Sequence, residues 1–414
     1  MNKNFFVQNR SNLYKKLEEQ SLLVLFAGKA PQKSADYDYE FVPNRNFYYL
    51  TGIDEPKIIF LAHKTGEKIE EYLFIEKSDP ILEKWIGKSI SKEDAEEVSG
   101  IKNIQFIEQF ETFLSRLITT VETSNLYLDL ERRELDTETT RAQQFASKIN
   151  ANYPYLQIKN AYPAICELRV YKNPEEIEKI KKAIDITHKG ILNLMSNAKA
   201  DMKEYQLEAY FDFTLKSEGV KHHAFHSIVA SGQNGTVLHY ENNDSIVEDG
   251  SLVLLDLGAQ LENYNADISF TFPVNGKFSE TQKTYYNVVL KALKETTQLI
   301  KPGIPFAKLN EHTKKILAEE CIKVGLIKEA TEISKYYYHG VSHFLGLDTH
   351  DVGSYKDLML KPGMVLTVEP GLYIEEEAIG IRIEDDVLVT EDGHEVLSKD
   401  IIRTVEEIED FMNK

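Results

Sequence analysis

Hydrophobic and polar positions in the first 150 residues follow the periods of a mixed helix and strand domain. Apolar positions recur at helical spacing over 6–20, and the apolar run from Ser21 to Gly28 predicts a strand that ends at glycine. Further strands are expected at 47–52, 57–63, 71–76 and 126–130, and helices at 91–99 and 109–119. This alternation predicts an α/β domain built on a central sheet.

A change in this pattern marks a domain boundary. A chain of 414 residues is too long for one ordinary core, so two domains are expected. Tyr153-Pro154 and Tyr162-Pro163 interrupt regular structure, because proline lacks a backbone donor and restricts the residue before it. The break is expected between about 150 and 172. We therefore divide the chain into an amino-terminal α/β domain, 1–160, and a second domain, 161–414.

Helix signals open the second domain. Asn173 is followed by Pro174, Glu175 and Glu176, which together predict a cap, a first-turn proline and acids at the positive end of the helix dipole. Three more helices are expected at 203–219, at 279–300 and from Pro305 to about 324. Strands lie between and after these helices, so the predicted fold class is α+β.

Two strands of the second domain each carry one acid among apolar residues. Asp256 lies in the stretch 252–258, and Asp267 lies in the stretch 265–272. If the strands form a hairpin about the polar turn 261–263, the two acids lie opposite each other on one face. Facing carboxylates on an apolar hairpin repel each other and are costly to desolvate, so a cation is expected between them.

The same arrangement recurs near the end of the chain. Glu369 lies in 365–374 and Glu384 in 379–389, and the acidic turn 375–377 joins the two strands. Pairing the strands about that turn sets Glu369 opposite Glu384. The domain therefore presents two facing carboxylate pairs, as expected of a duplicated, pseudo-symmetric domain with one central site.

Four carboxylates from two hairpins predict two hard divalent cations, since oxygen ligands favour manganese, magnesium or calcium. A nitrogen ligand shifts the preference toward manganese, cobalt or zinc, and His343 is the natural candidate. Two metals about 3.5–4 Å apart can hold a bridging hydroxide beside a polarised carbonyl, which is hydrolase chemistry. A lone acid is more often an edge or turn residue and a lone histidine a core group, but the repeated hairpin favours the metal site.

At these residues the chain resembles the creatinase-fold metallopeptidases, specifically the aminopeptidase P branch, over nearly its whole length. The segment 44–56 resembles the signature of that family's amino-terminal domain. The five metal-ligand positions of the family match, in order and local sequence, Asp256, Asp267, His343, Glu369 and Glu384. The resemblance implies a pita-bread catalytic domain, a dinuclear centre usually served by manganese, and a homodimer or homotetramer.

The resemblance also assigns roles to these ligands. Asp256 would chelate one metal, Asp267 and Glu384 would bridge both, and His343 with Glu369 would complete the second. Glu369 is in addition the catalytic candidate for moving a proton to and from the bridging water. Arg382 lies two residues before Glu384, on the same strand face, and is expected to hold a ligand carboxylate; the alternative is a surface salt bridge.

Further side chains match substrate positions of the family. His239 and His350 would act catalytically by donating hydrogen bonds to the scissile carbonyl or the tetrahedral intermediate. His339 would line the proline pocket, and so would Tyr355, which packing explains equally well. Trp85 matches an aromatic residue of the amino-terminal domain that reaches a neighbouring subunit's active site, although it could equally fill the core or an interface.

Three histidines form a cluster to which no ligand strand belongs. His222, His223 and His226 lie close together in sequence beside Phe225. Because no strand with a further metal ligand follows them, they are expected at the surface or at the edge of the pocket.

The implied activity is that of an Xaa-Pro aminopeptidase, which hydrolyses the bond between an amino-terminal residue and a following proline through a metal-bridging hydroxide. Manganese is the expected metal, with cobalt or zinc as alternatives. The amide before proline lacks an N–H group, so the ring must be recognised by shape. One alternative is a prolidase that cuts only Xaa-Pro dipeptides. Another is an inactive creatinase-fold binding protein, which the five retained ligands disfavour.

Charge and cysteine content narrow the partners and the compartment. The chain has 48 basic and 67 acidic residues and a net charge of −19, so neither nucleic acid nor a membrane is an expected partner. Cys166 and Cys321 are too few for a disulfide framework and match no zinc spacing, so both are expected to be inert thiols. The apolar run 22–27 is too short for a membrane span, and no secretory signal is evident. A cytoplasmic location is expected.

Overall fold

The computed structural model describes residues 1–121 and 123–414, which divide into two compact units. The first unit is Met1–Arg169 and the second is Val170–Lys414. Helix α7 (Tyr162–Arg169) belongs to the first unit because it packs against α1 (Lys3–Tyr14) and α2 (Arg45–Thr51). The division therefore lies at the end of this helix rather than at residue 160.

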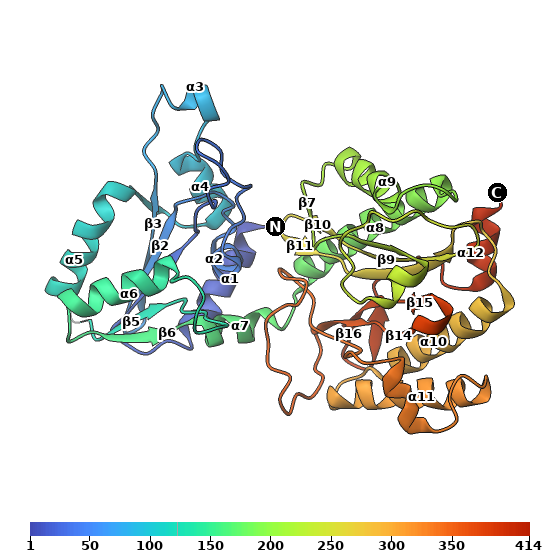
Figure 1. Ribbon diagram of the computed structural model, residues 1–414. Helices are drawn as coiled ribbons and strands as arrows, with labels where there is room; N and C mark the ends of the chain where they lie inside the picture. Colours follow the sequence, from blue (N-terminus) through green and yellow to red (C-terminus); the bar gives the residue numbers. More distant parts are fainter. Residues whose placement is uncertain (122) are drawn as a thin grey trace. The chain divides into compact units, whose positions relative to one another are not determined.

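The first unit is built on one six-stranded sheet in the order β4-β3-β2-β1-β5-β6 (Figure 1). Its strands are β1 (Ser21–Phe26), β2 (Ile59–Thr65), β3 (Lys68–Ile75), β4 (Asn103–Phe106), β5 (Asn125–Leu128) and β6 (Gln157–Asn160). Its other helices are α3 (Glu83–Ile86), α4 (Lys92–Ser99), α5 (Phe110–Thr120) and α6 (Arg141–Asn152), with a short 3₁₀ turn η1 (Ile107–Gln109). Every residue of β1 is buried, as a continuous apolar run in a covered central strand requires.

The prediction of a strand at 47–52 is wrong, because this segment forms helix α2. The side chain of Asn44 accepts a hydrogen bond from the Phe47 backbone N–H and caps the helix. Gly52 ends it in the left-handed conformation, and a side chain there would collide with the ring of Phe6. The aromatic residues suggested a strand, but the cap and the glycine determine the local structure. Similarly, the helix expected at 6–20 ends at Tyr14.

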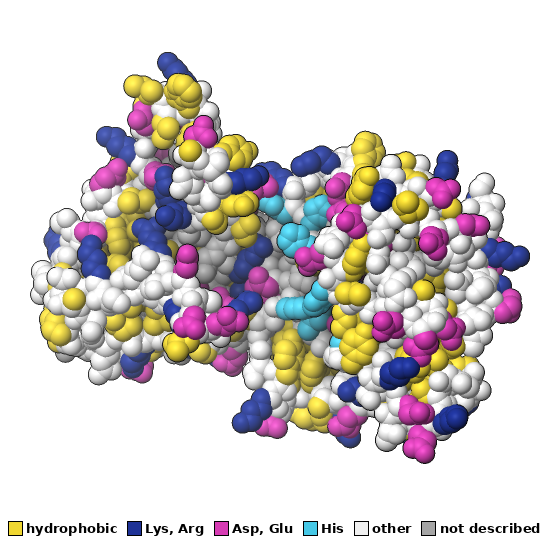
Figure 2. Space-filling model, in the orientation of Figure 1, with side chains coloured by type: hydrophobic (Ala, Val, Ile, Leu, Met, Phe, Trp, Pro, Cys, Tyr) yellow, Lys and Arg dark blue, Asp and Glu magenta, His cyan; other side chains and the backbone are white. Residues whose placement is uncertain are grey.

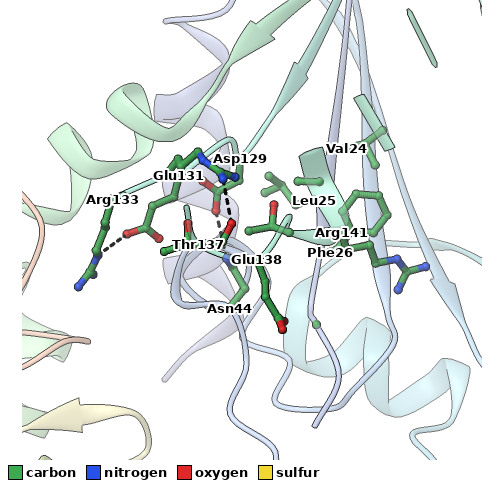
Figure 3. A pocket seen from close by; sticks show the side chains of 14 residues that line it. Val24, Leu25, Phe26, Asn44, Asp129, Glu131, Arg133, Thr137, Glu138 and Arg141 are labelled. Atoms are coloured by element: carbon green, nitrogen blue, oxygen red, sulfur yellow. Dashed lines mark hydrogen bonds and ion pairs between the residues drawn. The ribbon is translucent and has the colours of Figure 1, made fainter. Parts of the chain in front are cut away.

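A pocket of about 400 Å³ opens in the first unit near the carboxyl ends of the parallel strands β1 and β5 (Figure 3). Its lining combines Phe26, over whose ring the Arg141 guanidinium lies, with the buried carboxyl of Asp129. The side-chain amides of Asn44 and Asn46 both donate to Asp129 Oδ2.

The second unit repeats one order of elements: two long helices, then a strand hairpin (Figure 1). The first half contains α8 (Pro174–Asn197), α9 (Glu204–Ser217), β7 (His222–His223), β8 (Ile228–Ser231), η2 (Gly232–Thr236), β9 (Leu252–Leu257), β10 (Ala259–Leu261), β11 (Tyr264–Asn265) and β12 (Ile268–Pro273). The second half contains α10 (Glu280–Leu299), α11 (Ala307–Lys323), η3 (Ala330–Lys335), β13 (Val365–Val368), β14 (Gly371–Ile374), η4 (Glu375–Glu377), β15 (Ile379–Arg382), β16 (Asp385–Val389), β17 (His394–Val396) and α12 (Val405–Met412). The predicted start of α8 is confirmed, since Asn173 accepts from the backbone N–H groups of Glu175 and Glu176.

The first hairpin has a register two residues away from the predicted one. Glu262 and Asn263 both have positive φ and form the turn, so Asp256 pairs with Ser269 rather than with Asp267. Asp267 lies between β11 and β12. Successive side chains of a strand point to opposite faces of the sheet, so a shift of two residues leaves Asp267 on the predicted face. Ser269 lies on that same face.

The second hairpin has the predicted register. Val368 pairs with Asp385 in one ladder, and Gly371 pairs with Arg382 in the next. Glu369 and Glu384 fall in the break between these ladders, at positions that this register sets opposite each other.

Two further sequence expectations concern cysteines and membrane spans. Cys166 and Cys321 are free and buried, and burial raises the pKa of their thiols to about 11 and about 12. Within 1–121 and 123–414, none of the helices combines the length and the apolar character that crossing a membrane requires.

Candidate metal centre and active site

Three side chains of the second unit bring potential metal ligands together. One ligand atom each of Asp267, His343 and Glu384 lies within 4.8 Å of the other two. Asp267 comes from the first hairpin, Glu384 from the second, and His343 from the loop between η3 and β13. The two hairpins therefore converge on one buried point.

Hydrogen bonds between the hairpins hold Glu384 in place. Its backbone N–H donates to the carbonyl of Ser269, and the N–H and hydroxyl of Ser269 donate back to Glu384 Oε2, at 2.9 and 2.8 Å. Glu384 Oε1 is buried and has no hydrogen-bond partner in the described part of the chain. One carboxylate oxygen is thus fixed by the protein, and the other remains available to a cation.

The tautomer of His343 follows from its neighbours. Its Nδ1 lies 3.0 Å from the carbonyl oxygen of Phe344, which can only accept, so Nδ1 carries the proton. Nε2 faces Asp267 Oδ2 at 3.4 Å and Glu369 Oε1 at 3.6 Å. Nε2 is therefore the ring nitrogen that would bind a metal ion together with these two carboxylates.

Arg382 donates hydrogen bonds to three side chains around the cluster. Its guanidinium donates to Asp256 Oδ2 at 2.7 Å, to the Ser269 hydroxyl at 2.7 Å and to the Tyr373 hydroxyl at 3.1 Å. Asp256 Oδ1 is buried and makes no hydrogen bond to any residue that the structure describes. Arg382 therefore fixes the orientation of Asp256 and leaves one of its oxygens for a ligand.

The acids of this cluster hold their protons more tightly than ordinary carboxyls. Burial, followed by the charge of Asp256, raises the pKa of Asp267 well above its usual range. Burial and Asp267 do the same to the pKa of Glu384, and burial raises the pKa of Glu369 to about 7. Crowded acids with orphaned oxygens and a correctly oriented imidazole fit divalent cations, which would neutralise the charge.

His339 is part of the same network. Its Nδ1 lies 2.7 Å from the Gly340 carbonyl and its Nε2 lies 2.9 Å from the Tyr373 hydroxyl. The carbonyl requires a proton on Nδ1, so Nε2 accepts from Tyr373. Burial lowers the pKa of His339 to about 4, which keeps the ring neutral near pH 7.

The remaining predicted site residues lie around this cluster. The ring of His350 packs edge-on against that of His343, with 4.3 Å between centroids. His239 is exposed in the segment after η2. Histidine side chains gather on one face of the second unit (Figure 2). Tyr355 stacks on Phe344, and its hydroxyl accepts from the Phe344 backbone N–H at 2.9 Å.

The three-histidine cluster and Trp85 have different surroundings. Both ring nitrogens of His223 are engaged, Nε2 by Asp212 at 3.1 Å and Nδ1 by the Ser227 hydroxyl at 3.0 Å. His226 is exposed. In the first unit, Trp85 of α3 is 84% exposed and is not part of its unit's core.

Three residues at the centre were not identified from the sequence: Ser269, Tyr373 and Asp386. Asp386 is fully buried, and its Oδ2 accepts from the Asp267 backbone N–H. The signal for Asp386 was its position two residues after Glu384 in a strand. The predicted register paired Asp256 with Asp267, so Ser269 was not expected opposite Asp256. No sequence pattern indicated Tyr373.

Comparison with known proteins identifies the family of the chain. The sequence pattern of metallopeptidase family M24 matches residues 178–391, and that of the aminopeptidase P N-terminal domain matches residues 6–127. The chain is 34% identical to the Xaa-Pro aminopeptidase of Haemophilus influenzae, over 99% of this chain and 97% of the relative.

Solved structures give the same result. A Bacillus anthracis structure assigned as aminopeptidase P is 63% identical, with a TM-score of 0.99 and coverage of 100% of this chain and 99% of that one. Aminopeptidase P of Escherichia coli with the inhibitor Pro-Leu is 31% identical, with a TM-score of 0.92 and coverage of 100% and 98%. This chain therefore belongs to metallopeptidase family M24 and carries the N-terminal domain of the aminopeptidase P type.

Proposed function

We propose that this protein is an Xaa-Pro aminopeptidase, a metal-dependent exopeptidase that hydrolyses the bond between an amino-terminal residue and a following proline. The observation that carries the proposal is the buried cluster of Asp267, His343 and Glu384, whose ligand atoms converge within 4.8 Å. Full-length similarity to Xaa-Pro aminopeptidases supports the choice of substrate.

Membership of a metallopeptidase family means that the protein uses divalent metal ions. We assign two manganese ions to the cluster, with cobalt or zinc as alternatives. Asp256, Asp267, His343, Glu369 and Glu384 would hold them. The ions would polarise the scissile carbonyl and lower the pKa of a water molecule.

The side chains around the cluster handle protons and charge. Glu369, whose Oε1 lies 3.6 Å from His343 Nε2, would accept a proton from the attacking water and return it to the leaving amine. His239 and His350 would donate hydrogen bonds to the carbonyl oxygen as it becomes negative. Arg382 keeps Asp256 oriented through the 2.7 Å contact to its carboxylate.

The proline ring would be recognised by shape, because the amide before proline offers no N–H group to bind. We assign His339 and Tyr355 to the walls of this pocket. The neutral ring of His339 supports this assignment, since an uncharged imidazole fixed by Tyr373 can pack against an apolar ring.

We also propose that the protein forms a homodimer or homotetramer and acts in the cytoplasm. Exposed apolar side chains around α3, namely Ile81, Leu82, Trp85 and Ile86, support an interface at this part of the first unit. Two free, buried cysteines support a reducing compartment.

One experiment separates the proposed function from its alternatives. Manganese-loaded protein is given an Xaa-Pro-Xaa tripeptide and an Xaa-Pro dipeptide side by side, and the released first residue is quantified. Release from the tripeptide is expected. Cleavage of the dipeptide alone would identify a prolidase instead, and an inactive protein that binds no metal would identify a binding protein.

A further inference from the structure

Glu204 is a buried acid that belongs to neither hairpin of the metal cluster. It is the first residue of α9, and its exposed fraction is 0%. A buried carboxylate is stable only when donors surround it. Glu204 accepts five hydrogen bonds, and all the donors lie in the segment 231–245, which runs from the end of β8 toward β9.

The five donors lie on both sides of His239 in the sequence. Glu204 Oε1 accepts from the N–H and hydroxyl of Ser231, both at 2.7 Å, and from the Asn234 side chain at 3.0 Å. Glu204 Oε2 accepts from the Tyr240 hydroxyl at 2.8 Å and from the Ser245 N–H at 3.0 Å. The carboxylate of Glu204 therefore links the two arms of the loop 231–245, which are the residues before His239 and the residues after it.

The loop needs such a tie because it has little regular structure. Its only regular element after Ser231 is the 3₁₀ turn η2, and His239 itself is exposed. Leu238 and Tyr240, the neighbours of His239, pack against a small buried cluster that includes Tyr373. Tyr373 bonds both Arg382 and His339, so the base of the loop rests on the network beside the metal cluster.

The charge state of Glu204 strengthens the tie. Burial alone would raise the pKa of Glu204, but the hydrogen bonds from Asn234 and Ser231 outweigh burial and hold it below its ordinary value. The side chain is therefore a charged acceptor, and hydrogen bonds to a charged group are roughly twice as strong as neutral ones.

We propose that Glu204 is the positioning residue for His239: it holds the two arms of the loop 231–245 so that the exposed imidazole reaches the substrate carbonyl. This inference rests on the proposed function, in which His239 donates to that carbonyl. It assigns Glu204 a role in the rate of the reaction rather than in metal binding.

A double-mutant cycle tests the role of Glu204. Glu204→Gln keeps the side-chain volume but turns one oxygen into a donor that faces the donors of Tyr240 and Ser245. The variant is expected to lose about 100-fold in kcat on an Xaa-Pro-Xaa tripeptide, as a displaced catalytic group does. KM and the bound metal content should stay unchanged.

The same substitution in a His239→Ala background distinguishes positioning from general damage. If Glu204 acts through His239, the second substitution should cost at most about twofold more, because the two residues act as a unit. Equal, additive losses in both backgrounds, or a loss of metal in step with activity, would overturn the proposal. The matched control is Glu218→Gln in an exposed ion pair near the end of the same helix, which should leave kcat unchanged.

Hydrogen exchange gives a readout that does not depend on catalysis. In Glu204→Gln the amides of 231–245 are expected to exchange faster, while those of β9 and β12 keep the wild-type rate. Unchanged exchange in the loop would contradict the inference even if activity fell. If wild-type protein failed to release the first residue of the tripeptide, the proposed function would fail. Faster exchange of 231–245 in Glu204→Gln would still show that Glu204 holds this loop in place.

Discussion

At the scale of single residues, the candidate metal centre brings several acidic side chains close together. Asp267 and Glu384 are buried; the charge of Asp256 raises the pKa of Asp267, and the charge of Asp267 raises the pKa of Glu384. Without a cation such a site weakens the folded state, because carboxylates are costly to bury unpaired. The hydrogen bond from Ser269 to Glu384 and the hydrogen bond from Arg382 to Asp256 orient these acids but do not neutralise the cluster.

Asp267→Asn should therefore have opposite effects with and without metal. The metal-free variant is expected to melt at the same temperature as the wild type or a few degrees higher, because an amide cannot ionise and so cannot add to the repulsion among the acids. The rise in melting temperature on adding manganese should disappear, and turnover should be lost. Thermal scans in chelator and in excess manganese measure both effects, with Asp410→Asn in α12 as an exposed control.

An equal manganese response in Asp267→Asn and the wild type would refute the assignment of Asp267 as a ligand. Near-normal activity in Glu384→Gln would likewise refute the dinuclear centre, since the same argument applies to the opposing hairpin.

Glu176, which lies outside the cluster, is expected to make the stability of the folded state depend on pH. Burial raises its pKa to about 7, although its side chain accepts from the Asn173 N–H and the Tyr264 hydroxyl. Its folded pKa exceeds the ordinary value near 4.5. The folded state therefore binds the proton more tightly, and stability from this group is lost as pH rises from about 4.5 to about 7.

Glu176→Gln should remove this loss, because an amide does not titrate. Relative to the wild type, the variant is expected to gain on the order of 1–3 kcal/mol between pH 5 and pH 7.5. Urea unfolding of the metal-loaded proteins at several pH values measures the difference. A constant offset between the two proteins across this range would show that Glu176 does not titrate there.

At the scale of elements, buried polar ties connect segments that are far apart in the sequence. Lys172, just before α8, forms a buried ion pair with Asp351 at 2.8 Å, next to His350. Removing one partner of such a pair leaves a buried charge without compensation.

Lys172→Met is expected to destabilise the protein by about 3–5 kcal/mol, because the Asp351 carboxylate loses its ammonium partner. The double substitution Lys172→Met with Asp351→Leu should recover a large part of this loss. Denaturant unfolding measures both. A double variant no more stable than the single one would mean that the ion pair is not the source of the effect.

Local signals in the sequence predicted most helices correctly, because their caps are local. Asn173 and Ser91 both cap the helices they were expected to begin. The error at 47–52 arose because Phe47, Tyr48 and Tyr49 have high strand propensity, while the cap by Asn44 and the stop at Gly52 decide the structure.

The candidate site could be predicted in part, because the position of a turn is also a local signal in the sequence. The register of the second hairpin was predicted because the turn at 375–377 sits symmetrically between Glu369 and Glu384. The first register was missed by two residues, since a two-residue turn with positive φ at Glu262 and Asn263 leaves little trace in composition. Contacts such as that of Glu204 with Ser231 join distant segments, and a single sequence carries no signal for them.

At the scale of the whole molecule, the candidate metal ligands Asp267, His343 and Glu384 all lie in the unit Val170–Lys414. Each unit has its own core, so metal should stabilise one of them directly. Chelation is expected to lower the melting temperature of the second unit. If the free metal concentration was 100 times its Kd, removing the metal lowers the free energy of unfolding by about 2.7 kcal/mol. Calorimetry with and without chelator measures this, and an unchanged trace would contradict a metal site in that unit.

The most direct test compares two tripeptides, Xaa-Pro-Xaa and Xaa-Ala-Xaa, with manganese-loaded and with chelated protein, and quantifies the first residue released. We expect release from the proline peptide alone, loss of that release on chelation and its return when manganese is restored. Release from both peptides would contradict the specificity for proline. Release that persists after complete removal of metal would contradict the role of the carboxylate cluster itself.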